Sequence, residues 1–328
     1  MRHKIELIEL YLPDVMLNNQ DMQVNSVKLK AFDFFLKSGS LTLNPGLVPT
    51  QDILGHEAAL CAYFFDLDPA CFFIKADPVQ YILDMNQGVM IPGAFYLESA
   101  ESLIEKLNIF LAEDKLKLIR LDDKNMLIAS QKPIDYIAPS LLNAVNQAIC
   151  LDRFSGQDKA YWQRLSTELQ FLFSQNKLNQ NDPDGVYFWG AGVLPKDSLN
   201  INASFNQVIA NDYAVLGLAK LAKIDLNQVD FKSLENILEN IVKNTADLNK
   251  QNKILITTQD FSLFLGAGNA LEYEKLSIFF NELLVELIRL VKNKQLAKLV
   301  LNTGQKRYQL TRASILKSYF LSGFKFVI

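Results

Sequence analysis

Cysteine, long apolar runs and excess charge are all scarce in this sequence. Its three cysteines, Cys61, Cys71 and Cys150, are odd in number and form no CxxC pair, so we expect no disulfide framework and a reducing, cytoplasmic compartment. No segment approaches the roughly 20 consecutive apolar residues that a membrane-spanning helix needs. The net charge of -3 gives no electrostatic reason to expect nucleic acid or an anionic membrane as a partner.

What the sequence does contain is ample material for a hydrophobic core. It has 328 residues, of which 49% are hydrophobic and 21% charged, a composition typical of a globular chain with one large or two ordinary domains. Glu6 and Glu9 lie within the first apolar run, a pattern that is not that of a signal peptide.

The most regular pattern lies between residues 161 and 195. Polar and turn-forming residues from 176 to 184 follow a predicted amphipathic helix and end it. Residues 186–189 are strand formers without polar alternation, which predicts a strand covered on both faces, and Gly190-Ala-Gly192 follows at once. The apolar side of the helix recurs at three- and four-residue spacing: Trp162, Leu165, Leu169, Leu172 and Phe173.

The order of the predicted elements indicates an α/β fold. Strands at 5–12, 186–189, 208–210 and 253–258, with helices between the later ones, predict one mostly parallel sheet. Residues 71–129 read instead as a strand, two hairpins and one helix, which indicates an α+β unit with an antiparallel sheet. Residues 40–50 and 259–268 are predicted loops. We therefore predict a core of residues 1–73 and 181–328, with an inserted α+β domain at 74–180.

Six segments, spanning about residues 50 to 322, carry a family resemblance through their order along the chain. They are CFFIKADPVQYILD, SAESLIEKLN, YWQRLSTELQFLF, GVYFWGAGVLP, VIANDYAVLGLAKLAKI and LTRASILKSYF. In that order they are similar to segments of the RpfE-type bacterial regulatory protein family, which has Ala-Asp-Pro, Trp-Gly-x-Gly and Gly-Leu-Ala motifs. That family in turn resembles the archaeal-type cofactor-independent phosphoglycerate mutases of the alkaline-phosphatase superfamily. The resemblance implies an alkaline-phosphatase-like core with an inserted domain.

The same resemblance implies a chemistry for which this sequence lacks the residues. The mutases use two metal ions, a serine or threonine nucleophile, and aspartate and histidine ligands taken mostly from the C-terminal half. Here the only histidines are His3 and His56. Residues 257–260 and 301–304 stand where the two ligand sets would begin. We therefore expect no metal and no cofactor, and a regulatory or binding protein rather than an enzyme.

An alternative stays open, namely a phosphoryl-transfer enzyme, a mutase or phosphatase, with a carboxylate-based or metal-free site. Its candidate catalytic residues are Asp14, Asp212 and Asp260, each predicted at a strand end of the core. Asp14 stands where the first metal-binding aspartate of the mutases would be, and Pro13-Asp14 is equally an ordinary turn. Asp212 is also a predicted helix cap.

His56 and Cys61 form a second candidate pair. A cysteine beside a histidine can be nucleophilic, but five residues apart on a helix the two side chains point away from each other. Cys61 lies among alanine, leucine and phenylalanine, so we interpret it as a small core residue.

The turn at Trp189, Gly190 and Gly192 is the predicted binding cleft. We expect it at the C-terminal edge of the core sheet, between core and insert, with the glycines allowing close backbone approach and Trp189 closing the floor. The alternative is that the glycines merely supply positive φ or tight packing against a helix. The partner is expected to be a small molecule or a protein, not nucleic acid or a membrane.

Overall fold

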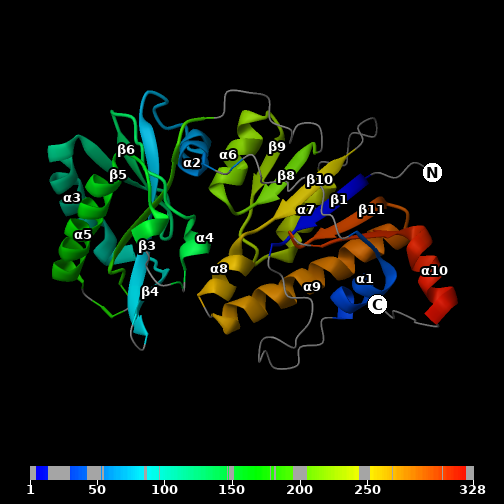
Figure 1. Cartoon of the computed structure of the whole chain (residues 1–328). Coiled ribbons are helices and arrows are strands. Elements are labelled where there is room, and N and C mark those ends of the chain that lie inside the picture. Colours follow the sequence, from blue (N-terminus) through cyan, green and yellow to red (C-terminus); the bar gives the residue numbers. More distant parts are fainter. Residues whose placement is uncertain are drawn as a thin grey trace. The chain divides into compact units, whose positions relative to one another are not determined.

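The chain folds into two compact units, each built on its own sheet (Figure 1). The computed structural model describes residues 5–13, 30–42, 53, 55–84, 87–95, 97–145, 147, 151–177, 179–180, 182–194, 205–243, 252–267, 269–304 and 306–322. The first unit comprises Met1–Gln51, Ser198–Leu265 and Asn269–Ile328, and the second comprises Asp52–Asp197 and Gly266–Gly268. The predicted domain boundaries, after 73 and after 180, fall inside the second unit, the first of them within β3 (Phe72–Asp84).

The first unit holds a seven-stranded, mostly parallel sheet in the order β2-β12-β11-β1-β10-β8-β9. Five neighbouring strands run parallel, and β12 and β2 are added antiparallel at one edge. The predicted parallel pairing of 5–12, 208–210 and 253–258 is thereby confirmed. The strands are β1 (Ile5–Tyr11), β2 (Ser40–Thr42), β8 (Gln207–Ala210), β9 (Asp225–Gln228), β10 (Lys253–Thr257), β11 (Leu296–Asn302) and β12 (Arg307–Thr311).

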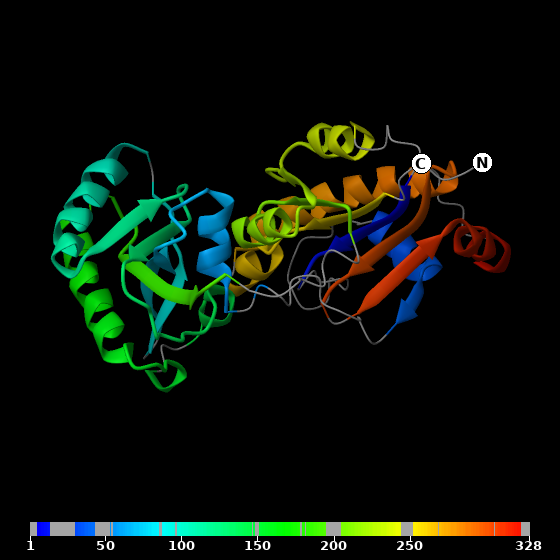
Figure 2. The same cartoon turned by 90° about the horizontal axis from the view of Figure 1, so that it is seen from above.

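Alternation along the strands decides which side chains face the helices. Ile8 and Leu10 of β1 pack into one cluster with buried residues of α1 and α9, and α9 runs along that face of the sheet (Figures 1 and 2). Glu9 and Tyr11 therefore point to the opposite face. The helices of this unit are α1 (Lys30–Ser38), α6 (Tyr213–Leu221), α7 (Leu234–Lys243), α8 (Asp260–Gly266), α9 (Ala270–Lys292) and α10 (Arg312–Ser322).

The second unit holds a five-stranded antiparallel sheet in the order β4-β3-β6-β5, with β7 also paired to β3. The predicted helix α5 buries the apolar side that its spacing indicated, and Trp162 meets Phe188 of β7 edge to face at 5.0 Å between ring centroids. The elements are β3, β4 (Gln87–Pro92), β5 (Leu116–Arg120), β6 (Met126–Ser130), β7 (Gly185–Gly192), α2 (Glu57–Phe64), α3 (Leu97–Leu111), α4 (Leu141–Ala144) and α5 (Lys159–Asn176).

The strand at 186–189 corrects the sequence prediction. It is part of β7, which pairs antiparallel with β3 of the second unit instead of joining the parallel sheet. Its burial is as predicted, since Val186, Tyr187 and Phe188 are all buried. An apolar run without alternation indicates that a strand is buried on both faces. It does not indicate which strand it pairs with, so the pairing with β3 could not be predicted from the sequence.

Three short elements also differ from the predictions. β2 and α8 lie in segments predicted as loops, and β9 was not predicted at all. β2 and β9 are edge strands of three and four residues, too short to show a period. Among the described residues, no helix is long and apolar enough to cross a bilayer.

Candidate functional site

The carboxyl ends of the parallel strands lie together at one edge of the first unit's sheet. β1, β10 and β11 are neighbours, with Tyr11 paired to Thr257 on one side and to Asn302 on the other. β8 follows beyond β10, with Ala210 paired to Thr257. Open α/β sheets bind ligands outside this edge, so we take it as the candidate site.

Four polar side chains form a row across this edge, on the face opposite the α9 cluster. Thr257, Tyr11, Asn302 and Arg307 are successive register partners on β10, β1, β11 and β12. Thr257 is 1% exposed, Tyr11 7% and Asn302 0%. We call these four residues the polar row. Burying so many polar groups is costly unless they are hydrogen-bonded, so each partner matters.

Glu9 organises one end of the polar row. Its Oε1 accepts from Asn302 Nδ2 at 3.0 Å, and its Oε2 accepts from Arg307 Nη2 at 2.7 Å. Asn302 Oδ1 in turn accepts from the amide of Gly304 at 3.0 Å, in a turn where Gly304 has a φ of 81°. A buried carboxylate thus holds a guanidinium across β11, and both polar atoms of the Asn302 side chain are used in protein bonds.

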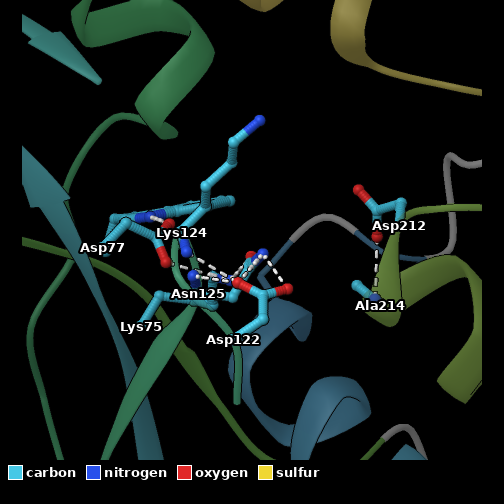
Figure 3. A network of polar contacts seen from close by, with 8 residues as sticks. Lys75, Asp77, Asp122, Lys124, Asn125, Asp212 and Ala214 are labelled. Carbon is cyan, nitrogen blue, oxygen red and sulfur yellow. Dashed lines mark hydrogen bonds and ion pairs between the residues drawn. The ribbon is translucent and has the colours of Figure 1, made fainter. Parts of the chain in front are cut away.

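The turns after β8 and β10 place two of the three predicted catalytic aspartates. Asp212 caps α6, because its Oδ1 accepts from the amides of Ala214 at 2.8 Å and Val215 at 3.0 Å. Figure 3 shows the bond to Ala214. Asp260 begins α8, and its Oδ2 accepts from Asn211 Nδ2 at 2.6 Å. Each carboxylate therefore has a structural task at the end of a neighbouring strand. Asp14 lies outside the described residues.

The groups at this edge do not fit the two-metal centre that the family resemblance implies. Residues 257–260 and 301–304 lie at the carboxyl ends of β10 and β11, the two strands flanking β1. These two segments supply three hydroxyls, two amides and one carboxylate, that of Asp260, and no imidazole. Within the described ranges no three His, Cys, Asp or Glu side chains gather as a metal site. Two divalent ions bridging a phosphoryl group need carboxylate or imidazole ligands for both ions.

The predicted cleft residue Trp189 belongs to a buried polar network in the second unit. Figure 3 labels its members Lys75, Asp77 and Asn125. Its indole N–H donates to Asp77 Oδ2 at 2.7 Å, and Asp77 Oδ1 lies 3.1 Å from Lys75 Nζ. Lys75 also donates to Asn125 Oδ1 at 2.8 Å and lies 5.8 Å from the Trp189 ring centroid. Burial raises the pKa of the Asp77 carboxyl above its ordinary value, although Lys75 and the Trp189 N–H act to lower it.

The two cleft glycines of the prediction lie against the start of α2. Gly190 has a φ of 62°, and a Cβ on it would lie 3.2 Å from Glu57 Oε2. A Cβ on Gly192 would lie 2.0 Å from the carbonyl oxygen of Gly55, so only glycine fits there. Positive φ and close packing thus account for both residues. Their role in a cleft between core and insert stays a prediction, although the core-sheet edge on which we argued it belongs to other strands.

His56 and Cys61 belong to the same helix, α2, but have different surroundings. His56 stands at the N-cap of α2 with its Nδ1 2.6 Å from the carbonyl oxygen of Val193, while Cys61 is 2% exposed inside the helix. The core interpretation of Cys61 is confirmed.

Sequence reasoning missed Glu9 and the Lys75–Asp77 pair. The available signal was a charged residue inside an apolar strand pattern, IELIELY in β1 and FFIKADP in β3. A charge at a position that alternation marks as buried must have a partner, although the sequence does not say which one.

Comparison with known proteins gives similarity of fold only. The cofactor-independent phosphoglycerate mutase from Thermoplasma acidophilum DSM 1728 is 11% identical, covers 94% of this chain and 90% of its own, and has a TM-score of 0.41, too low to argue from. The PH0037 protein from Pyrococcus horikoshii is 11% identical over 94% of this chain and 87% of its own, with a TM-score of 0.50. No protein family and no curated protein matches the sequence. The likeness to PH0037 shows a shared fold and nothing about activity.

Proposed function

We propose that this chain is a regulatory or binding protein that takes a small molecule at the carboxyl edge of its parallel sheet. In this proposal it is a relative of the RpfE-type family that keeps a phosphoglycerate-mutase-like scaffold without metal-dependent phosphoryl transfer. The observation that carries it is the donor set at the edge, where the two segments that would hold metal ligands supply hydroxyls, amides and a single carboxylate.

The contacts of those groups support the same conclusion. Asn302 has both side-chain atoms in bonds to Glu9 and Gly304, and Asp212 uses its Oδ1 for two helix-cap bonds. Asp260 accepts from Asn211. A metal ion that took Asp212 Oδ1, Asp260 Oδ2 or Asn302 Oδ1 as a ligand would compete with bonds that already stabilise the fold, each contributing about 0.5–1.5 kcal/mol net.

Metal analysis and an activity screen test the proposal together. The purified chain is dialysed against Mn²⁺, Zn²⁺ and Mg²⁺ in turn, its bound metal is measured, and mutase and phosphatase turnover are assayed under each condition. We expect less than one metal per chain and no turnover above buffer. Stoichiometric metal with turnover would overturn it.

The rival proposal is a phosphoryl-transfer enzyme with a carboxylate-based site, and the placement of Asp212 and Asp260 at neighbouring strand ends favours it. Substitution of Asp260 by Asn separates the two proposals. If turnover exists and depends on that carboxylate, Asp260→Asn abolishes it while urea unfolding reports an intact fold. If no turnover exists in the wild type, the rival fails before any variant is needed.

A further inference from the structure

The two most exposed large apolar side chains among the described residues lie on the outer side of the second unit's helices. α3 and α5 contact each other and cover one face of its sheet (Figures 1 and 2). Ile109 of α3 is 70% exposed and Phe171 of α5 is 64% exposed. Each lies two positions after a buried leucine, Leu107 or Leu169, which is about 200° around a helix. Both side chains therefore point away from the sheet.

These two side chains lie at a similar level because α3 and α5 run antiparallel. Lys106 Nζ donates to Asn176 Oδ1 at 2.6 Å at the end of α5, and Tyr161 OH donates to Asp114 Oδ2 at 2.7 Å near its start. Counted from the first of these bonds, the two exposed residues lie roughly 4.5 Å and 7.5 Å along their helices. The axes of packed helices are roughly 8–10 Å apart. We call Ile109 and Phe171 the apolar patch.

The α3 side of the apolar patch is acidic. Residues 97–114 contain five Asp and Glu and a single Lys. Glu101, Glu105 and Glu113 are exposed, and within the part of the chain that the structure describes none of their carboxylates has a bonding partner. Arg164 of α5 is already paired with a carboxylate, at 3.5 Å. A partner that fits here brings an apolar side chain with positive charge beside it, and an anionic membrane is repelled.

The same chain carries a helix face with the complementary properties, on α10 of the first unit. Leu316 is 45% exposed, and Arg312 and Lys317 are exposed beside it, while Ile315 faces inward at 2%. Arg312 and Leu316 are four residues apart, so they lie on one side of the helix. Residues 287–328 contain nine Lys and Arg and no Asp or Glu, so no carboxylate of this stretch offsets the two positive charges.

We propose that the apolar patch of one copy of this chain binds the α10 face of a second copy. Leu316 packs over the α3–α5 pair against the two exposed apolar side chains, and Arg312 and Lys317 meet the carboxylates of α3. Each copy carries both surfaces, so the contact is heterologous. The inference goes beyond the proposed function and does not depend on it, because neither surface belongs to the carboxyl edge of the parallel sheet.

Sedimentation velocity of the full-length protein over a range of concentrations tests the contact. It is measured at salt concentrations of about 0.01 M and about 1 M, where the Debye length is roughly 30 Å and 3 Å. We expect dimers or larger species at low salt, because α3 and α10 carry opposite charges. The dissociation constant should rise roughly tenfold or more at high salt, since salt screens charges that are exposed on both surfaces.

Substitution of the exposed phenylalanine tests the apolar patch. Phe171→Gln should raise the dissociation constant roughly tenfold or more, because the largest apolar side chain leaves the interface. Leu271→Gln is the matched control, since Leu271 is 62% exposed on α9 and belongs to neither surface, and it should associate as the wild type does. Both replaced side chains are exposed, so urea unfolding should report an intact fold in each variant.

A charge exchange tests whether α10 is the occupant. Glu105→Lys makes α3 less acidic and Lys317→Glu makes the α10 face less basic, so each variant alone should associate more weakly than the wild type. In an equal mixture, the altered α3 of one variant meets the altered α10 of the other with opposite charges again. The mixture should therefore associate more tightly than either variant does alone.

Three outcomes overturn the inference. A monomer at every concentration means that no second copy binds, and a salt-dependent sedimentation coefficient of that monomer would place the contact within one chain. An oligomer that Phe171→Gln leaves unchanged uses another surface. A mixture that associates no more tightly than its two components removes α10 from the contact and leaves the apolar patch to a different protein. The metal and turnover assays decide the proposed function separately in each case.

Discussion

At the residue scale, two adjacent threonines at the end of β10 should respond oppositely to the same substitution. Thr257 Oγ1 is buried and has no partner within the described ranges, whereas Thr258 Oγ1 accepts from the Asp260 amide at 3.0 Å. Thr257→Val removes an unsatisfied hydroxyl, so we expect the free energy of unfolding to rise by about 1 kcal/mol. Thr258→Val removes an acceptor and should lower it by about 1 kcal/mol. Urea unfolding of both variants measures the difference, and an equal loss in each would contradict it.

Asp77 predicts a pH dependence whose sign follows from burial. Its pKa in the folded state is raised above the ordinary value of 3.8, chiefly because burial disfavours the carboxylate. The folded state then holds the proton more tightly than the unfolded one, so this group's contribution to stability is complete below pH 3.8 and is lost as pH rises through the folded pKa. Asp77→Asn cannot titrate.

Unfolding in urea at a series of pH values above 4 therefore compares the two proteins directly. We expect the wild type to lose stability relative to Asp77→Asn as the pH rises. The opposite trend would mean that the ammonium of Lys75, 3.1 Å away, governs the carboxyl more strongly than burial does.

Some residue roles were readable from the sequence and others were not. The cap at Asp212 follows from local order, because an aspartate before a run of small apolar residues finds the amide donors for its carboxylate two and three residues ahead. Glu9 is different. Its partners, Asn302 and Arg307, lie almost 300 residues away, and only the strand order β1-β11-β12 brings them together.

At the scale of elements, Gly192 determines how closely β7 can approach the turn before α2. A Cβ there would lie 2.0 Å from the Gly55 carbonyl oxygen, so Gly192→Ala must displace one backbone segment. We expect a loss of roughly 2–3 kcal/mol in the free energy of unfolding. Gly88 in β4 is the matched control, since nothing lies within 4 Å of its added Cβ, and Gly88→Ala should change stability little. Equal effects in the two variants would contradict the packing argument.

Elements whose signal is local were predicted well. The hairpins β3–β4 and β5–β6 and the long helix α5 are all present, because period and turn residues lie within each segment. β7 shows the limit of prediction from local sequence. Its residues are buried as the pattern indicated, but its pairing with β3 joins residues more than 100 positions apart. The composition of a strand does not identify its partner strand.

For the whole molecule, the tryptophans separate the two units spectroscopically. Both, Trp162 and Trp189, lie in the second unit, so tryptophan fluorescence reports that unit alone, while far-ultraviolet circular dichroism reports helices and strands of both. Each unit has its own sheet and its own buried cluster, and such units can unfold as separate cooperative transitions.

Two variants, one in each unit, then test whether the units unfold independently. We expect Thr258→Val in the first unit to lower the urea midpoint of part of the circular dichroism signal while the fluorescence midpoint stays where it is. Gly192→Ala in the second unit should lower the fluorescence midpoint and leave the remaining circular dichroism transition unchanged. The reason is that a substitution destabilises only the cooperative unit that contains it. If the fluorescence and circular dichroism midpoints shift together in both variants, the chain unfolds in one cooperative transition. The two units would then be distinct in the structure but would not unfold independently.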